Sequence, residues 1–380
     1  MAQTVDVAVI GGGIHGCSAA LHLRQRGAMV ALFEAGLCGA QASGVNFGGV
    51  RQHGRDAAEI PLAMRSRAIW GRIKEILGHD GEFVASGHLR VATSDAHLAE
   101  LEAWSRLARE HGLLPELIGR NAVRDRYPWL AERALGASLL AEDGQANPRL
   151  VSPLFARAAR RAGAAINENA KVTGVARDGA GFAIETWNGF TCRARILVNA
   201  AGAWGAEIAS RLGEKFPLEA RGPTMSVTEP LAPFIFPNLG VMDGIYLRQV
   251  ARGNVVFGGG HSAPDLERRR VRPAPEHMAR AGRIMLDTIP SLRGAAIIRS
   301  WSGIEGYTPD DKPVLGVSAA VPGLVHCFGF SGHGFQLGPG AGAVVAEQAL
   351  DGKTPTDIGG LSPARFAATP RPSPPSASSG

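Results

Sequence analysis

The chain of 380 residues is too long for one minimal domain and predicts two interleaved domains, each with its own hydrophobic core. A composition of 45% hydrophobic and 19% charged residues excludes a disordered or fibrous protein. The four cysteines are scattered without metal-ligand spacing, which predicts reduced thiols and no metal site. The apolar start is too short to span a bilayer and lacks a basic leader, so we expect no membrane span and a cytoplasmic protein.

The net charge of +6 reflects a chain rich in arginine, with one dense run at Arg268, Arg269, Arg270 and Arg272. Such a run can meet nucleic acid or an acidic partner. It has no interleaved aromatic residues and no nucleic-acid motif accompanies it. We therefore expect a solvated basic loop and no nucleic-acid partner.

The first 33 residues predict a strand, a helix and a second strand. Apolar residues then recur at helical spacing in three segments, which are residues 59–77, 96–110 and 148–162. Strands returning to the first sheet are expected at residues 171–175, 182–186 and 196–200. Short β-rich runs at 224–228, 245–248 and 255–258, with a helix at 276–287, predict an antiparallel cap. A strand at 324–328, a glycine-rich stretch at 329–342 and a helix at 341–350 complete the pattern.

This order predicts an α/β fold in which a discontinuous Rossmann-type nucleotide-binding domain is interleaved with a mainly antiparallel substrate-binding cap. We assign residues 1–90, 146–215 and 300–355 to the nucleotide-binding domain. Residues 91–145 and 216–299 are assigned to the cap. The Pro/Ser-rich residues 369–380 are expected to be a disordered tail.

The sharpest motif is a G-x-G-x-x-G at residues 11–16, between a predicted strand and a predicted helix. Gly11 permits the tight turn, Gly13 lets the backbone approach a pyrophosphate, and Gly16 allows close packing of helix and strand. Glu34 ends the second strand, where an acidic side chain accepts hydrogen bonds from the adenosine ribose. Its charge disfavours a 2′-phosphate, so NADP is disfavoured while FAD and NAD both remain possible.

Two later segments favour a flavin. Small residues in Asn199–Trp204 stand at a strand end entering a helix, where the backbone can approach a bulky cofactor. Residues 329–335, followed by Gly338, Pro339 and Gly340, again place glycines just before a predicted helix. The positive end of that helix would face the negative charge that a reduced flavin ring carries.

With these segments in family order, the chain resembles the D-amino-acid oxidase-like family of FAD-dependent oxidoreductases from about Val5 to Leu350. The family includes glycine oxidase, sarcosine oxidase and the β subunits of heterotetrameric sarcosine and proline dehydrogenases. The resemblance implies that residues 42–49 lie along the flavin and that the backbone of Val172 meets the adenine. The implied cofactor-binding residues are Gly11, Gly13, Ile14, His15, Gly16, Glu34, Ala35, Ser43, Gly44, Asn46, Gly48, Gly49, Val50, Arg51, Val172, Ala200, Ala201, Gly202, Trp204, Gly303, Gly329, Gly332, His333, Gly334, Phe335 and Gln336.

Departures from the family pattern sharpen the prediction. No cysteine lies between Trp301 and Asp310, where some members tether the flavin, so FAD is expected to be non-covalent unless a histidine such as His53 serves. Glu305 stands where glycine oxidase-like relatives place an arginine for the substrate carboxylate. Either another arginine holds the acid group, with Arg51 and Arg248 as candidates, or the substrate presents a cation at Glu305.

The predicted reaction is oxidation of the carbon–nitrogen bond of an amino acid or secondary amine, such as a D-amino acid, an N-alkyl glycine, proline or an opine. Hydride transfer to the flavin gives an imine. No lysine lies between Lys215 and Lys312, so the oxygen-activating lysine of monomeric sarcosine oxidases is missing from the cap, which favours a dehydrogenase that passes electrons to a carrier. Residues 301–310 resemble the β subunits of multi-subunit amine dehydrogenases, which implies an electron-accepting partner subunit. The candidate catalytic residues are His53, Tyr246, Arg248, His261, Glu305 and His333.

The residues alone leave three alternatives to an FAD enzyme that oxidises amines. The N-terminal unit also suits an NAD-dependent dehydrogenase. The chain can instead be a flavin-containing subunit that relays electrons or serves structurally in a multi-subunit dehydrogenase. An FAD enzyme on the same fold can also oxidise a hydroxy acid or glycerol phosphate, because a fold does not fix a substrate.

Overall fold

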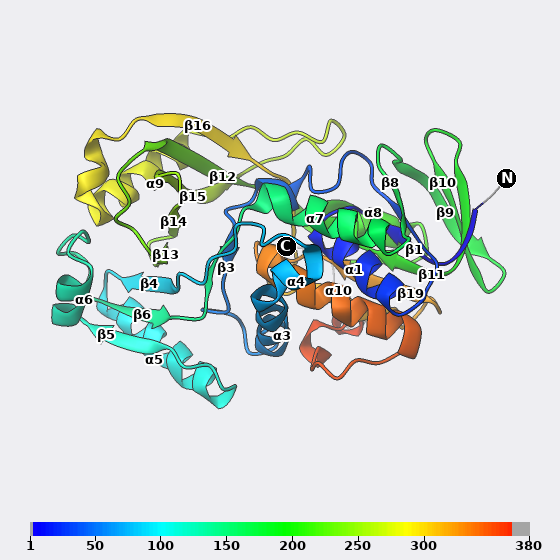
Figure 1. Cartoon of the computed structure of the whole chain (residues 1–380), viewed down its shortest axis with the longest axis horizontal. Coiled ribbons are helices and arrows are strands. Elements are labelled where there is room, and N and C mark those ends of the chain that lie inside the picture. The colour runs from blue at the N-terminus through cyan, green and yellow to red at the C-terminus, as the bar shows by residue number, and fades with distance from the viewer. Residues whose placement is uncertain (1–2, 367–380) are drawn as a thin grey trace, which may run out of the picture.

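The computed structural model describes residues 3–366 and shows two lobes, each built on one large sheet (Figure 1). The predicted tail at residues 369–380 lies outside the described residues. In Figure 1 the eight-stranded sheet lies on the right and the nine-stranded sheet on the left. This arrangement confirms a Rossmann-type α/β lobe joined to a mainly antiparallel cap, while the exact domain boundaries stay a prediction.

The eight-stranded sheet has a parallel centre in the order β19-β11-β1-β2-β8, with β18 antiparallel at one edge. The antiparallel pair β9 and β10 extends from β11. Because β1 and β2 are buried on both faces, their sequences are nearly continuous apolar runs. The strands are β1 (Gln3–Ile10), β2 (Val30–Phe33), β8 (Ala165–Asn167), β9 (Val172–Asp178), β10 (Gly181–Thr186), β11 (Thr191–Asn199), β18 (Val314–Val317) and β19 (Leu324–Phe328).

The nine-stranded sheet runs β16-β12-β15-β14-β13-β4-β6-β5, and β17 pairs with β12 beside it. All of its pairings are antiparallel except β13 with β4. The sequence patterns missed β4, β5 and β6, which join this sheet from the first half of the chain. The strands are β4 (His88–Ala92), β5 (Glu116–Gly119), β6 (Gly136–Leu140), β12 (Glu219–Pro230), β13 (Asn238–Val241), β14 (Ile245–Gln249), β15 (Asn254–Ser262), β16 (Ile297–Ser302) and β17 (Glu305–Tyr307).

Helices cover both lobes, and a two-stranded ribbon, β3 (Gly49–Val50) with β7 (Gly144–Gln145), lies at their junction. The main core packs α1, α3, α7 and α10 against the eight-stranded sheet, and α9 packs on the cap sheet. No helix of the described residues is long and apolar enough to cross a membrane. The helices are α1 (Ile14–Gln25), α2 (Ala42–Val45), α3 (Ile60–Gly71), α4 (Ile73–Leu77), α5 (Asp95–Glu110), α6 (Arg120–Arg126), α7 (Pro148–Arg161), α8 (Gly205–Ser210), α9 (Pro275–Thr288) and α10 (Gly334–Asp351).

The last helix begins earlier than its composition predicted. We expected a start at residue 341, but α10 begins at Gly334 and contains Pro339 and its flanking glycines. A Cβ at Gly338 would come within 3.0 Å of the Ile14 side chain of α1, and one at Gly340 within 3.0 Å of Ser66 of α3. Close packing of three helices, which only glycine permits at these positions, therefore overrides the low helix propensity.

Candidate active site

Three chain turns far apart in sequence meet at one cavity of about 850 Å³ between the lobes. They follow β1, β11 and β19, the parallel strands whose carboxyl ends share one edge of the sheet. Gly11 lies directly against the carbonyl of Ala200, and the ring of His15 stacks on Phe330 with centroids 3.7 Å apart. The convergence of these turns is the geometry that a single dinucleotide-sized ligand requires.

The first turn needs its glycines for steric reasons. Gly11 has a φ of +108°, and a Cβ there would overlap the Ala200 carbonyl. A Cβ at Gly16 would overlap the Gly11 carbonyl, so the helix could not start where it does. Gly13 faces the cavity, where a Cβ would contact only Ser43, whose Oγ accepts a 3.0 Å hydrogen bond from the Ile14 amide. The turn therefore presents bare backbone at the N-terminus of α1.

Glu34 lines the same end of the cavity and is fixed by two backbone donors. Its carboxylate accepts hydrogen bonds of 2.7 Å from the amides of Gly12 and Gly36. Each oxygen keeps lone pairs for the hydroxyls of a ribose. Val172 lines this end too, and Arg269 of the cap donates a 3.1 Å hydrogen bond to the Ala35 carbonyl.

Arg269 departs from the solvated loop that the arginine run predicted. Its neighbours Arg268, Arg270 and Arg272 are exposed, whereas Arg269 is half-buried, with a left-handed φ of +54°, and lines the cavity. The cap thus reaches over the end of the cavity where Glu34 lies.

Most residues predicted to bind the cofactor line this cavity. They are Gly11, Gly13, His15, Glu34, Ala35, Ser43, Asn46, Gly48, Gly49, Arg51, Val172, Ala200, Ala201, Gly202, Trp204, Gly329, Gly332, His333, Gly334, Phe335 and Gln336. The residues that do not line it are Ile14, Gly16, Gly44, Val50 and Gly303. Among these, Gly44 packs against Gly39 and Gly303 packs against Val45.

Of the candidate catalytic residues, Tyr246, His261, Glu305 and His333 line the cavity, whereas His53 and Arg248 do not. His53 is fully buried and packs on Trp104 with ring centroids 4.6 Å apart. The Arg248 guanidinium donates a 2.8 Å hydrogen bond to the Gln145 side chain, and burial lowers its pKa to about 10. The structure therefore brings four of these side chains together and leaves two outside the wall.

A group of positive charges that the sequence did not single out as a set stands at one side of the cavity. Arg51 and Arg55 both line the wall, and Arg55 is only 2% exposed. Burial and the neighbouring guanidinium groups of Arg55 and Arg90 lower the Arg51 pKa to about 9. Within residues 3–366, Nε and Nη1 of Arg55 have no hydrogen-bond partner. Buried donors without partners favour an anionic ligand group at this place.

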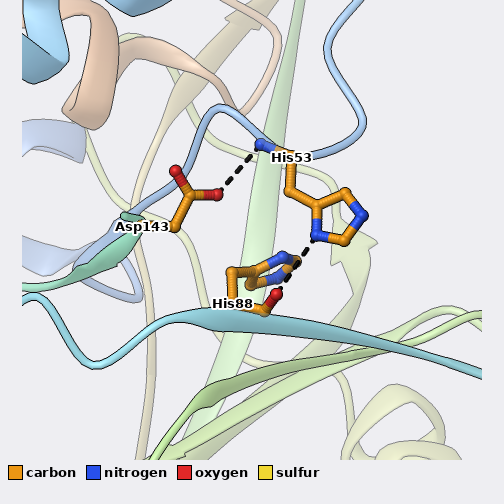
Figure 2. Close-up of side chains that lie close together, drawn as sticks. All are labelled: His53, His88 and Asp143. Atoms are coloured by element: carbon orange, nitrogen blue, oxygen red, sulfur yellow. Dashed lines mark hydrogen bonds between the residues drawn. The ribbon is translucent and has the colours of Figure 1, made fainter. Parts of the chain in front are cut away.

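His88 lies near these arginines, and Figure 2 shows it beside His53 and Asp143. The ligand atoms of the three side chains lie within 4.8 Å of one another, close enough to consider a metal ion. Asp143 already accepts hydrogen bonds from the backbone amides of Gln52 and His53, at 2.8 and 3.0 Å. Burial raises the pKa of Asp143 to about 6.

The surrounding charges oppose a metal at this group. Burial and then the positive charges nearby, those of Arg51, Arg55 and Arg90 among them, lower the pKa of His88 well below its ordinary value. A divalent cation would meet the same repulsion. His53 Nδ1 is also bound to the His88 carbonyl at 3.1 Å. We therefore keep the prediction of no metal.

The opposite charge lies on the strand β17 of the cap. Glu305 is half-buried in the cavity wall, and burial raises its pKa to about 7, although a 3.2 Å hydrogen bond from the Tyr307 hydroxyl opposes this rise. Tyr307 in turn contacts His261 Nε2 at 3.1 Å. Tyr246 lines the wall nearby, with its ring 4.8 Å from that of Phe47.

His333 belongs to a third group, at the N-terminus of α10. Its Nδ1 lies 2.9 Å from both carboxylate oxygens of Glu59, and its carbonyl accepts a 3.4 Å hydrogen bond from Arg55. Burial and the charge of Arg55 lower the pKa of His333 to about 4, although Glu59 opposes this. Glu59 therefore fixes the ring, which suits a positioning role at the cavity wall.

Sequence reasoning missed Arg55, His88 and Tyr307 as site residues. Arg55 follows Arg51 by four positions, but a loop gives no fixed periodicity from which to infer a shared face. His88 belongs to a strand that the patterns missed, and Tyr307 was read only as part of a family motif. A useful signal was the density of charge in residues 51–59, where Arg51, Arg55, Asp56 and Glu59 fall within nine positions.

A dinucleotide-binding turn and one large cavity beneath an antiparallel cap define a nucleotide-dependent oxidoreductase of the Rossmann type. The chain belongs to the FAD dependent oxidoreductase family named DAO, which matches residues 6–348. FAD is the cofactor. The cavity fits FAD in its volume, its bare glycine backbone at Gly13 and the acceptor at Glu34.

Among curated proteins, the chain is 29% identical to a glycine oxidase of Geobacillus kaustophilus over 94% of this chain and 96% of the relative. It is also 29% identical to the sarcosine oxidase subunit beta of Rhizobium meliloti, over 89% of this chain and 82% of the relative. Among solved structures, L-proline dehydrogenase from P. horikoshii superposes with a TM-score of 0.90 at 27% identity, covering 97% and 99% of the two chains. These relatives support the oxidation of amines or amino acids by an FAD enzyme.

Proposed function

We propose that the chain oxidises the carbon–nitrogen bond of a secondary amino acid, with the substrate carboxylate at Arg51 and Arg55 and its amine at Glu305. The observation that carries the proposal is that Arg51, Arg55 and the carboxylate of Glu305, groups of opposite charge, line one cavity. A zwitterionic amino acid matches both signs, whereas a simple amine leaves the arginines unpaired. Relatives named for sarcosine and L-proline, both secondary amino acids, agree with this class.

Bound FAD supplies the acceptor of the hydride from the carbon that bears nitrogen. The chain's own residues orient the substrate and manage its charge. Arg51 and Arg55 fix the carboxylate, Tyr246 closes the cap side, and Glu305 holds the ammonium group and takes its proton, because only a neutral amine can release hydride readily. The cavity lies between the two lobes, and this enclosure excludes water from the hydride transfer.

The test is anaerobic mixing of the FAD-loaded protein with proline and with pyrrolidine, which lacks the carboxylate, while the flavin absorbance is followed. We expect proline to bleach the flavin far faster than pyrrolidine. Arg55→Met should slow the reaction with proline roughly 10- to 100-fold, the equivalent of ~1.5–3 kcal/mol for a charged hydrogen bond, and leave pyrrolidine nearly unchanged. Arg252→Met, at an exposed cap arginine paired with Glu82, is the matched control.

A panel that includes sarcosine, D-amino acids, opines and glycerol phosphate widens the test. Bleaching by glycerol phosphate and by no amine would overturn the proposal. Air admitted after reduction then separates oxygen from another acceptor. Among the described residues, the lysine that lines the cavity is Lys171, beside Val172 and at the end where Glu34 lies. We therefore propose slow reoxidation in air and an electron-accepting partner subunit.

A further inference from the structure

Three side chains form a continuous hydrogen-bonded chain along the cap side of the cavity. Glu305 Oε2 lies 3.2 Å from the Tyr307 hydroxyl, which lies 3.1 Å from His261 Nε2. Glu305 and Tyr307 belong to β17 and His261 to β15, and both strands pair with β12. The sheet therefore fixes the spacing of the three groups.

The three hydrogen-bonded side chains differ in their exposure to solvent. Glu305 is half-buried in the wall of the substrate chamber, and Tyr307 is 7% exposed. His261 is exposed at the other end. His261 lines the same cavity and is exposed, so a proton passed along these three groups would move from a half-buried carboxylate to an exposed imidazole.

We propose that Glu305, Tyr307 and His261 form the proton exit of the amine oxidation, an inference that rests on the proposed function. The substrate N–H bond breaks as an O–H bond forms on Glu305. That proton then passes to the Tyr307 oxygen while the Tyr307 hydroxyl proton passes to His261 Nε2. His261 releases a proton to solvent, so one proton leaves and no redox partner is needed.

The charges around His261 keep its ring in the neutral form and favour release of any proton it receives. Burial and then the nearby Arg221 and His277 lower the pKa of His261, against the opposing carboxylates of Asp311 and Glu219. His261 is therefore neutral near pH 7, and its Nε2 can accept a proton. Arg221 also lies 5.0 Å over the Tyr307 ring.

Tyr307 faces the carboxylate of Glu305 and the hydroxyl of Tyr246 as well. Burial and then these neighbours raise the Tyr307 pKa. The hydroxyl therefore stays protonated and acts by passing a proton on, as a positioning residue between the other two groups.

Tyr307→Phe removes only the hydroxyl, and Tyr127→Phe, in the cap and away from the cavity, is the matched control. Flavin reduction by proline is measured anaerobically in the FAD-loaded enzyme, in H₂O and D₂O, on both sides of the Glu305 pKa of about 7. We expect a limiting rate at least about tenfold lower in Tyr307→Phe, with a solvent isotope effect that the control lacks and little change in proline affinity. An unchanged rate, pH profile and isotope effect would overturn the proposal.

His261→Ala, at an exposed position, tests the other end should Tyr307→Phe fold poorly. Its limiting rate should fall in the same way and recover when free imidazole is added, since a small base can then accept the proton. A rate that falls without recovery indicates a structural role and contradicts the exit.

A substrate-free measurement separates this inference from the proposed function. If no amine reduces the wild-type flavin, the proposed function fails. The infrared band of the protonated Glu305 carboxyl is then titrated with pH in the FAD-loaded protein. Because the Tyr307 hydroxyl stabilises the carboxylate, Tyr307→Phe should raise the midpoint, whereas Tyr127→Phe should not. An unchanged midpoint contradicts the hydrogen-bonded chain itself.

Discussion

Replacing Glu305 by glutamine should make the protein more stable, and more so at alkaline than at acidic pH. The folded chain holds this carboxyl with a pKa of about 7, against an ordinary value of 4.5. Between these pH values the folded state keeps a proton that the unfolded state releases. The stability contributed by Glu305 therefore falls as pH rises through this window, and the full loss is present above about pH 7.

The difference between the folded and unfolded pKa values of Glu305 sets the size of the stability change. A full shift of this size corresponds to about 3 kcal/mol, at about 1.4 kcal/mol for each pH unit. Because Glu305 is half-buried, solvent screening reduces the expected value to about 1–2 kcal/mol. Glutamine keeps the shape and a hydrogen-bond acceptor for Tyr307 but cannot ionise.

The assay is urea unfolding of the wild type and of Glu305→Gln, at about pH 5 and about pH 8 and at one fixed free FAD concentration, because FAD stabilises the folded state by mass action. The stability difference between the two proteins should grow by about 1–2 kcal/mol from the lower to the higher pH. Glu267→Gln, at an exposed glutamate of the same cavity, controls for the loss of one negative charge. A difference that stays constant with pH would refute the reasoning.

Two further predictions follow from the cavity wall. Arg269→Ala should weaken FAD binding several-fold, up to about tenfold, as measured by flavin fluorescence, because the cap loses its hydrogen bond to the Ala35 carbonyl. The exposed Arg268→Ala should not, and equal effects of both changes would contradict this contact. Prolonged dialysis against a chelator should leave flavin reduction unchanged, since positive charges surround His88, His53 and Asp143. Stoichiometric metal in the purified protein, with activity lost on its removal, would contradict that expectation.

The parts of the fold that could be predicted are those dictated by local sequence. The turn at Gly11 needs a positive backbone φ and glycines without side chains, so its sequence alone is enough to predict it. Buried parallel strands such as β1 and β2 are continuous apolar runs, and Glu34 stands at a fixed distance beyond them. These requirements act over about 30 residues and survive without knowledge of the rest of the chain.

The start of α10 and the strands β4, β5 and β6 could not be predicted because distant partners decide them. Gly338 and Pro339 are poor helix formers, but packing of α10 against α1 and α3 selects small residues there. The strand β4 pairs with β13, about 150 residues later, so nothing near His88 shows that it extends a sheet. Tertiary context overrides local preference in both cases.

The substrate chamber was harder to predict for a further reason, which also governs its selectivity. Arg55 and Glu305 come from different lobes, and their charges face one cavity only when the lobes meet. Each charge is shielded from water, so a ligand that lacks its counterpart leaves it unpaired, a larger penalty than a lost surface contact. Selectivity among substrates should therefore depend on whether a substrate carries both a negative group for the arginines and a positive group for Glu305. Changing the sign at Glu305 alone, as in Glu305→Arg, would add a positive charge to those of Arg51 and Arg55 and favour a substrate with two acidic groups.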